Sequence, residues 1–150
     1  IALYGIIGDS VREEFKKWPA LNDKVVVHGY LNQSQLKEKM HDASVLLVIQ
    51  NRSENATRII PYKLFEYLPM QRPILQLGAS FGDSNDILNE LGYCSALDVA
   101  DKKAMKDEVK SLFRNWQNKQ EIAASGKLEK YKHPFLVKKL VDEIGRLTHE

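Results

Sequence analysis

Three charged residues lie close to Pro61: Arg58 precedes it, and Lys63 and Glu66 follow it. Because proline needs no N–H partner in a first helical turn, this position predicts a helix that begins at Pro61. The N-terminus of a helix attracts phosphate, and Lys63 and Arg58 add cations that suit a diphosphate. Glu66 falls on nearly the same helical face as Lys63, where a carboxylate suits the two hydroxyls of a ribose. The pattern indicates a nucleotide diphosphate, with an exposed ion pair between Lys63 and Glu66 as the alternative.

The elements that must position these residues alternate between short apolar runs and amphipathic stretches. We expect strands at 3–7, 25–28, 45–49, 73–77 and 94–97. We expect helices at 11–18, at 34–43 with Ser34 as its cap, from 61 onward, and at 86–91 after a polar turn over 83–86. Three more helices are expected at 101–117, 119–131 and 134–147. This order predicts an α/β fold with a parallel sheet covered by helices, followed by C-terminal helices.

Parallel sheets of this kind bind ligands beyond the carboxyl ends of their strands. The segments that follow the first four strands are 8–9, 29–30, 50–60 and 78–83, so a site is expected among them. The strand at 45–49 is apolar on both faces, which predicts an interior strand. The long polar loop at 50–60 leads from this strand to the helix at Pro61.

The stretch 60–75 reads Ile-Pro-Tyr-Lys-Leu-Phe-Glu-Tyr-Leu-Pro-Met-Gln-Arg-Pro-Ile-Leu. It resembles the segment IPxKxFEYLAxGxPIL of glycosyltransferase family four, whose members are retaining enzymes with a GT-B fold. Residues 6–9 and 27–30 are similar to the family's L-x-I-x-G-x-G and V-x-F-x-G strand ends, and residues 36–49 to its L…Y…A-D-V-x-L-x-P helix and strand. The resemblance covers about residues 1–117 and is strongest at 59–77.

The resemblance implies a Rossmann-like three-layer sandwich that forms the C-terminal, donor-binding half of a GT-B enzyme. Residues 1–150 would be one domain, with a helical tail at about 101–150. An N-terminal acceptor domain, absent from this chain, would complete the cleft and carry catalytic residues. The chain opens on Ile1 rather than on Met, which we interpret as a piece of a longer protein. Such a piece alone is expected to be inactive, because catalysis needs donor and acceptor held together.

The resemblance also implies a role for individual residues. Glu66 matches the second glutamate of the family's pair, which holds the ribose hydroxyls, and Lys63 would contact a phosphate or the sugar. The other residues that would bind the donor, mainly through backbone or ring contacts, are Gly8, Gly29, Tyr30, Ile60, Pro61 and Tyr62. Tyr30 would pack around the base, and the backbone leading into the helix at Pro61 would cradle the diphosphate.

One position departs from the family pattern. The family's first glutamate lies eight residues before the second, and Arg58 occupies that position here. In the family this acid contacts the donor sugar, so Arg58 becomes a candidate contact to that sugar, and the sugar's identity is left open. The branch with K-x-F-E-Y often lacks this glutamate as well.

Composition and charge limit the classes of partner that we expect. A net charge of +2 over 150 residues excludes a generic polyanion, so no nucleic acid partner is expected. The single cysteine, Cys94, rules out an internal disulfide and suits a reducing, cytoplasmic compartment. The four histidines lack metal-ligand spacing, so we expect no metal. The resemblance implies that no cofactor is needed and that the substrate is a UDP-sugar or a GDP-sugar. A peripheral association of the full enzyme with the inner face of the membrane is left open.

Two alternative functions remain open. A sugar-nucleotide epimerase uses a similar cleft, although its His-Arg-Glu site is not found. A non-catalytic nucleotide-binding or interaction module is the other alternative, although a receiver domain would need acids that 8–9 and 50–51 do not supply. His28, at a strand end, is interpreted as a structural or surface histidine. Phe113, Trp116 and Tyr131 are interpreted as packing residues.

Overall fold

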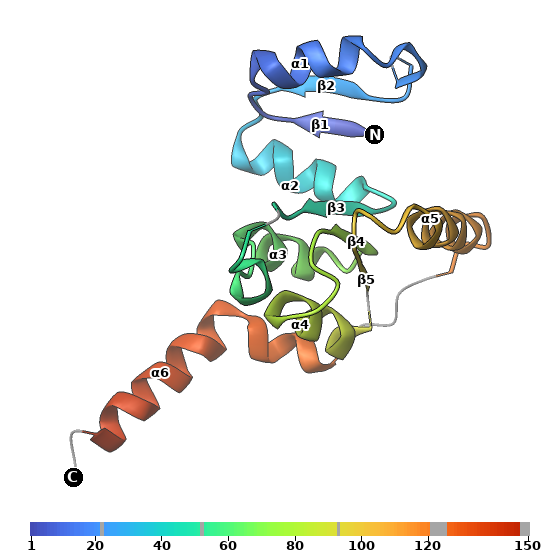
Figure 1. The fold of residues 1–150 in the computed structure, drawn as a ribbon. Coiled ribbons are helices and arrows are strands. Elements are labelled where there is room, and N and C mark those ends of the chain that lie inside the picture. Colours follow the sequence, from blue (N-terminus) through green and yellow to red (C-terminus); the bar gives the residue numbers. More distant parts are fainter. Residues whose placement is uncertain (22, 52, 93, 121–125, 148–150) are drawn as a thin grey trace. The chain divides into compact units, whose positions relative to one another are not determined.

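The chain has an α/β fold with parallel strands (Figure 1). The computed structural model describes residues 1–21, 23–51, 53–92, 94–120 and 126–147. The chain divides into two compact units, Ile1–Asp42 and Ala43–Glu150. Each unit has its own parallel sheet and is described by itself below.

The first unit is built on a pair of parallel strands, β1 (Ala2–Tyr4) and β2 (Val26–Gly29). Between them the chain forms α1 (Asp9–Lys16) and the 3₁₀ turn η1 (Pro19–Leu21), and α2 (Gln33–Asp42) follows β2. This order confirms the predicted strand–helix–strand–helix sequence at 3–43, with boundaries shifted by a few residues.

The first strand ends earlier than the sequence predicts. Gly5 adopts φ +124°, which is strained for other residues, and its N–H donates to the carbonyl of Gly29 at 2.6 Å. The chain therefore leaves the strand direction after Tyr4, and the side chain of Ile6 is 91% exposed. The prediction that the strand extends to residue 7 is wrong for this reason.

The cap of α2 is also not the residue that the sequence suggests. The Oδ1 atom of Asn32 accepts from the N–H of Gln35 at 2.9 Å, and the Oε1 atom of Gln35 accepts from the N–H of Asn32 at 3.2 Å. This reciprocal pair is the capping-box arrangement. Ser34, which we predicted as the cap, lies within the first turn of the helix instead.

The first unit buries few of its side chains. Among its described residues only Met40 is buried, while Trp18 is 60% exposed and Val11 is 45% exposed. On α2 the side chain of Met40 is buried, and that of Leu36, four residues earlier, is half-buried.

The second unit contains a parallel sheet in the order β3 (Leu46–Ile49), β4 (Ile74–Leu77) and β5 (Cys94–Leu97). The central strand β4 is buried over its first three residues. The prediction that 45–49 is an interior strand is wrong, because β3 is at an edge of this sheet and Ile49 is 66% exposed. Apolar composition on both faces did not distinguish an edge strand from a central one.

Short helical segments connect these strands. The 3₁₀ turn η2 (Ala56–Arg58), α3 (Tyr62–Tyr67) and the 3₁₀ turn η3 (Leu68–Met70) lie between β3 and β4, and α4 (Asp83–Leu91) lies between β4 and β5. The largest fully buried apolar side chains of this unit come from these segments and the strands: Leu64, Leu68, Ile74, Leu88 and Val48. In the segment after Pro61 the side chains of Leu64 and Leu68 are thus fully buried, and that of Phe65 is half-buried.

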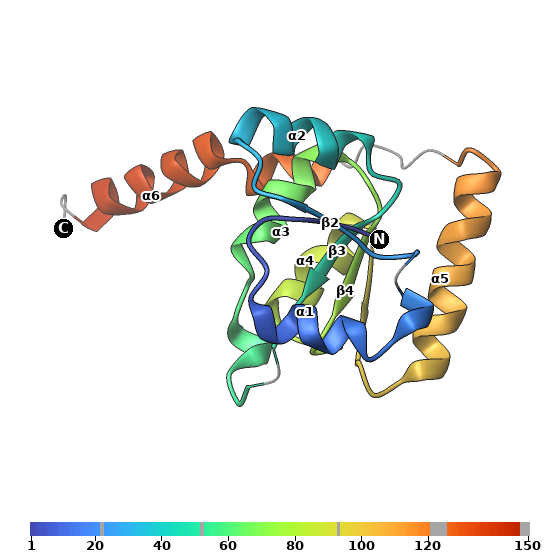
Figure 2. The same cartoon turned by 90° about the horizontal axis from the view of Figure 1, so that it is seen from above.

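The C-terminal part of the second unit is helical. It contains α5 (Lys102–Gln117), the 3₁₀ segment η4 (Gly126–Tyr131) and α6 (His133–Leu147), as Figures 1 and 2 show. The predicted helix at 119–131 is wrong, because Lys119 adopts φ +51° and Gly126–Tyr131 is 3₁₀; residues 121–125 lie outside the described part of the chain.

Two aromatic residues of α5 are more exposed than we predicted. Phe113 and Trp116 stack on each other with ring centroids 5.7 Å apart, but they are 54% and 57% exposed. Their interpretation as packing residues thus holds for their contact with each other, although more than half of each side chain is exposed. Over the residues that the structure describes, no helix is long and apolar enough to cross a bilayer.

Candidate functional site

The loop that follows β3 is held in place by a buried glutamine. Gln50 is 8% exposed, and its Nε2 donates to the carbonyls of Ala56 at 2.5 Å and Ile59 at 2.9 Å. One side chain thus ties down both ends of η2, just before the chain enters α3. Its Oε1 is buried and has no hydrogen-bond partner among the described residues.

Two glycines allow the loop after β4 to lie very close to the loop after β3. A Cβ atom at Gly82 would lie 2.2 Å from the carbonyl oxygen of Thr57, and one at Gly78 would lie 2.8 Å from Cβ of Gln50. Both glycines also have positive φ, +112° at Gly82 and +154° at Gly78. Only glycine allows this approach of the two backbones. The two loops at the carboxyl edge of the β3–β4 pair are therefore held in place against each other.

The three charged residues near Pro61 lie on η2 and α3, the segments that follow this loop. Arg58 ends η2 and is exposed, Lys63 is in the first turn of α3 and is exposed, and Glu66 is half-buried one turn later. Lys63 and Glu66, both described by the structure, are not within ion-pair distance of each other. The alternative of an i,i+3 pair is therefore not what the structure shows, and both side chains are available to a ligand.

Glu66 is half-buried, and its charge acts on the neighbouring Tyr67. Burial raises the pKa of the neighbouring Tyr67 phenol, and the negative charge of Glu66 raises it further. The Glu66 carboxylate thus lies near a protonated phenol at neutral pH, on the helix whose opposite side carries fully buried Leu64.

The helix itself begins one residue later than predicted. Pro61 has extended backbone and is the N-cap, and its carbonyl accepts from the N–H of Leu64 at 2.9 Å, so α3 starts at Tyr62. Ile60 and Pro61 are half-buried, and Tyr62 is 76% exposed. Because α3 has only six residues, its dipole is small, and attraction of a diphosphate would depend mainly on Lys63 and Arg58.

The remaining predicted contacts belong to the first unit. Gly8 is the N-cap of α1, with its carbonyl accepting from the N–H groups of Val11 at 3.0 Å and Arg12 at 3.2 Å. Gly29 ends β2 with φ +75°, and the ring of Tyr30 directly after it is 78% exposed.

The histidine on β2 is accounted for by packing. The His28 ring stacks on Tyr4 of β1 with centroids 4.7 Å apart. The His28 side chain is also exposed, so both observations agree with its interpretation as a structural or surface histidine.

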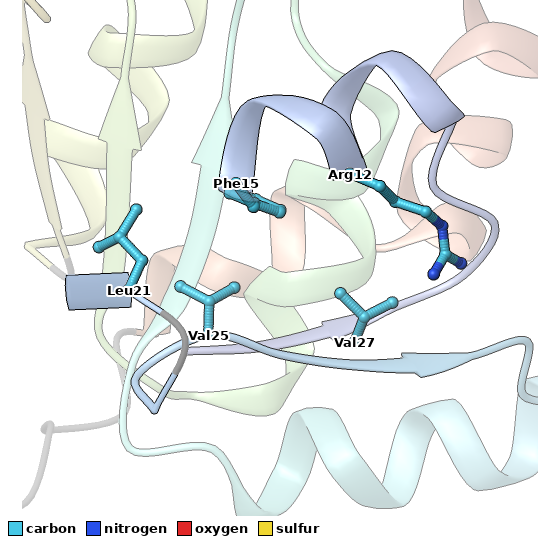
Figure 3. A pocket seen from close by; sticks show the side chains of 5 residues that line it. All are labelled: Arg12, Phe15, Leu21, Val25 and Val27. Carbon is cyan, nitrogen blue, oxygen red and sulfur yellow. The ribbon is translucent and has the colours of Figure 1, made fainter. Parts of the chain in front are cut away.

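The hollow in the first unit is not lined by the predicted residues. It has a volume of about 180 Å³, and Figure 3 shows the five side chains that line it: Arg12 and Phe15 of α1, Leu21 of η1, and Val25 and Val27. The two valines share a face because alternate residues of a strand do so. The hollow is apolar apart from Arg12, whose Nε donates to the carbonyl of Ile7 at 3.3 Å. We therefore place no nucleotide there.

Some residues of this edge were not predicted. Gln50 ends an apolar run, and no sequence signal indicates that its amide holds a loop. Gln76, fully buried on β4, donates to Oγ of Ser84 at 2.9 Å. The predicted polar turn over 83–86 is wrong, because Gly82 is the N-cap and these residues form the first turn of α4.

Comparisons with known proteins do not place the chain in a family. No protein-family model, curated protein or solved structure matches it. Within the described part of the chain, no group of three or more His, Cys, Asp or Glu side chains is placed to hold a metal ion.

Proposed function

We propose that the chain is the nucleotide-diphosphate-sugar binding domain of a retaining glycosyltransferase, corresponding to the C-terminal half of a GT-B fold. The observation that carries the proposal is the edge of the β3–β4 pair. There Gln50, Gly78 and Gly82 hold two loops together, and the chain that leads from the first of these loops through α3 carries two exposed cations and a half-buried acid. The parallel sheet supports the proposal because such sheets bind nucleotides beyond their carboxyl ends.

Each charged residue has a role that follows from its chemistry. An ionised carboxylate accepts only, and its two oxygens suit the adjacent hydroxyls of a ribose, which is the role of Glu66. Lys63 and Arg58 face the diphosphate or the sugar as cations, and Arg58 replaces the acid that glycosyltransferases of family four place at this position. The backbone of Ile60, Pro61 and Tyr62 lies alongside the diphosphate.

For the first unit, taken by itself, the resemblance implies contacts to the base and the phosphates. Tyr30, whose ring is exposed, would pack around the base, and Gly8 and Gly29 would contact the donor through their backbone. Sugar transfer itself requires an acceptor domain, which would hold the acceptor in line with the donor sugar. By itself the chain is expected to bind the donor and not to transfer the sugar.

The test is a titration of the full chain with UDP and with GDP, followed by NMR. We expect saturable shifts at Lys63, Glu66 and Gly29 for one of the two diphosphates, and weaker shifts with AMP, which lacks the second phosphate. Glu66→Ala should weaken binding by about tenfold or more, since hydrogen bonds to a charged group contribute about 1.5–3 kcal/mol. Glu108→Ala, which removes a half-buried acid from α5, is the matched control and should leave binding unchanged.

Two outcomes would contradict the proposal. One is the absence of saturable binding of either diphosphate at millimolar concentration. The other is a Glu66→Ala variant that binds as well as the unaltered chain. Equal binding of AMP and the diphosphates would favour a general nucleotide-binding module over a sugar-donor domain.

A further inference from the structure

The last helix of the second unit presents an apolar face. On α6 the side chains of Leu136, Val137, Leu140, Val141 and Leu147 are between 43% and 75% exposed. At about 100° per residue these positions, together with Ile144, fall within one arc of the helix. Figures 1 and 2 both show α6 leading away from η4. Such a face indicates a surface that another helix covers.

Charged residues border this face in an ordered way. Lys138 and Asp142, four residues apart, lie beyond the Val141 side of the arc. Lys139 and Glu143, also four residues apart, lie beyond the Leu136 side. On both borders the cation is thus toward the N-terminus of the helix and the anion toward its C-terminus.

We propose that α6 pairs with the α6 of a second copy of this chain, antiparallel and about a twofold axis between Leu140 and Val141. In an antiparallel pair each border faces the same border of the other helix running in the opposite direction. Lys138 then faces the partner's Asp142, and Lys139 faces the partner's Glu143. In the apolar seam Leu140 packs on the partner's Val141. One surface is complementary to itself, as a twofold interface requires.

The parallel arrangement does not fit the same pattern. It would bring opposite borders together at the same height, with Lys138 against the partner's Lys139 and Asp142 against the partner's Glu143. Like charges at these positions oppose association. A membrane surface fits less well than a second helix, because the two anions offset most of the attraction that Lys138, Lys139 and Arg146 would have for anionic lipid.

The interface requires one existing surface pair to exchange. Glu143 is 3.3 Å from Nη1 of Arg146, and both side chains are more than half exposed, so this pair exchanges readily for Lys139 of the second copy. Two helices of this length bury less surface than a typical stable interface. We therefore expect a reversible dimer that dissociates on dilution into the micromolar range. This inference does not depend on the proposed function.

The test is sedimentation of the 150-residue chain over a concentration series with two charge-reversed double variants. Lys138→Glu with Lys139→Glu makes both borders acidic, and Asp142→Lys with Glu143→Lys makes both basic. Each variant alone should dimerise at least tenfold more weakly than the unaltered chain. Mixed together they should form a heterodimer, which also shows that both are folded. Lys102→Glu with Lys103→Glu, the same charge change at exposed positions of α5, is the control and should have no effect.

Orientation is tested by disulfide cross-linking. A mixture of the Val137→Cys and Ile144→Cys chains should give the mixed disulfide, with the chain bearing only Cys94 as the background control. The proposal is overturned if the unaltered chain stays monomeric at millimolar concentration or if the charge-reversed variants dimerise as well as it does. It is also overturned if Val137→Cys cross-links to itself in preference, as a parallel pair requires, or if a monomeric chain binds anionic vesicles through α6.

Discussion

Gly82 combines a backbone conformation and a close contact that no other residue can satisfy. Its φ of +112° with extended ψ belongs to a region that is essentially restricted to glycine, and a Cβ there would meet the backbone of Thr57. Gly82→Ala is expected to destabilise the chain by about 3 kcal/mol or more, since backbone strain and overpacking add. Urea unfolding followed by circular dichroism measures the change.

Gly92 is the control for this prediction. It also has positive φ, +69°, but a Cβ there would meet nothing within 4 Å. Gly92→Ala should therefore cost only about 1 kcal/mol, the penalty of the left-handed backbone alone. Equal losses for the two variants would show that the contact with Thr57 does not matter.

At the scale of residues, the sequence was informative where a side chain's chemistry acts at the surface. Arg58, Lys63 and Glu66 were predicted as a group from their spacing; the structure puts Arg58 on η2 and the other two on α3, and their role as one site stays a prediction. Gln50 was not predicted, because the hydrogen bonds of a single amide to two carbonyls depend on the path of a loop without periodicity. The tight approach at Gly82 depends on another segment, Thr57, and is likewise invisible in the local pattern.

At the scale of elements, a cluster of three side chains ties η4 to α4. The Glu90 carboxylate accepts a hydrogen bond from Lys130 and another from the Tyr131 hydroxyl at 2.7 Å. The hydrogen bond from Lys130, and then that from Tyr131, holds the pKa of Glu90 below its ordinary value of 4.5. The hydrogen bond to Glu90 raises the pKa of Lys130, and burial, followed by the hydrogen bond to Glu90, raises that of Tyr131.

The hydrogen bonds of Glu90 predict how the stability of the chain changes in acid. Because the folded pKa of Glu90 lies below the unfolded one, its stabilisation is present above pH 4.5 and is lost as the pH falls through the folded pKa. The difference in unfolding midpoint between the unaltered chain and Glu90→Gln should therefore shrink between pH of about 6 and about 3. Glu129→Gln, an acid paired with Lys132 on an exposed turn, is the control with little effect. A pH-independent difference for Glu90→Gln would contradict the prediction.

The same cluster also loses stability in alkali, through Lys130. The pKa of Lys130 is raised above 10.5, so its attraction for Glu90 is fully present below that pH and is lost as the pH rises through the raised value. The junction of η4 and α4 is thus most stable between these two limits.

Most element types were predictable, whereas several ends were not. The strand at Cys94–Leu97 was placed correctly, although its Cys94 side chain lies outside the described part. The end of β1 at Tyr4 depends on Gly5, and the start of α2 depends on the reciprocal bonds of Asn32 and Gln35. In both cases neighbouring residues could end the strand or begin the helix, and hydrophobic periodicity does not distinguish between them. Whether a strand is central or at an edge, as for β3, depends on the neighbours it acquires.

At the scale of the whole molecule, the two units differ in how much they bury. Ile1–Asp42 contains Met40 as its one buried side chain among the described residues, whereas the second unit has Leu64, Leu68 and Leu88 at 1% exposure or less. A unit of this size with so little apolar burial contributes little stability of its own. The one-domain interpretation of the chain stays a prediction.

Hydrogen exchange of the full chain measures this difference. Amides of the β1–β2 pair should exchange at least about tenfold faster than those of the β3–β4 pair, after correction for intrinsic rates, because local opening of the first unit exposes less apolar surface. Equal protection of the two pairs would mean that the units open together and would contradict the prediction.

The two tryptophans of the chain are divided between the units, with Trp18 after α1 and Trp116 near the end of α5. Both rings are more than half exposed, so replacing either with phenylalanine sacrifices little packing. With excitation at wavelengths that tyrosine does not absorb, the tryptophan fluorescence of the Trp116→Phe chain then comes from the first unit alone, and that of the Trp18→Phe chain from the second alone. The molecule thus carries one natural optical reporter in each unit, and the melting of each can be recorded without a label.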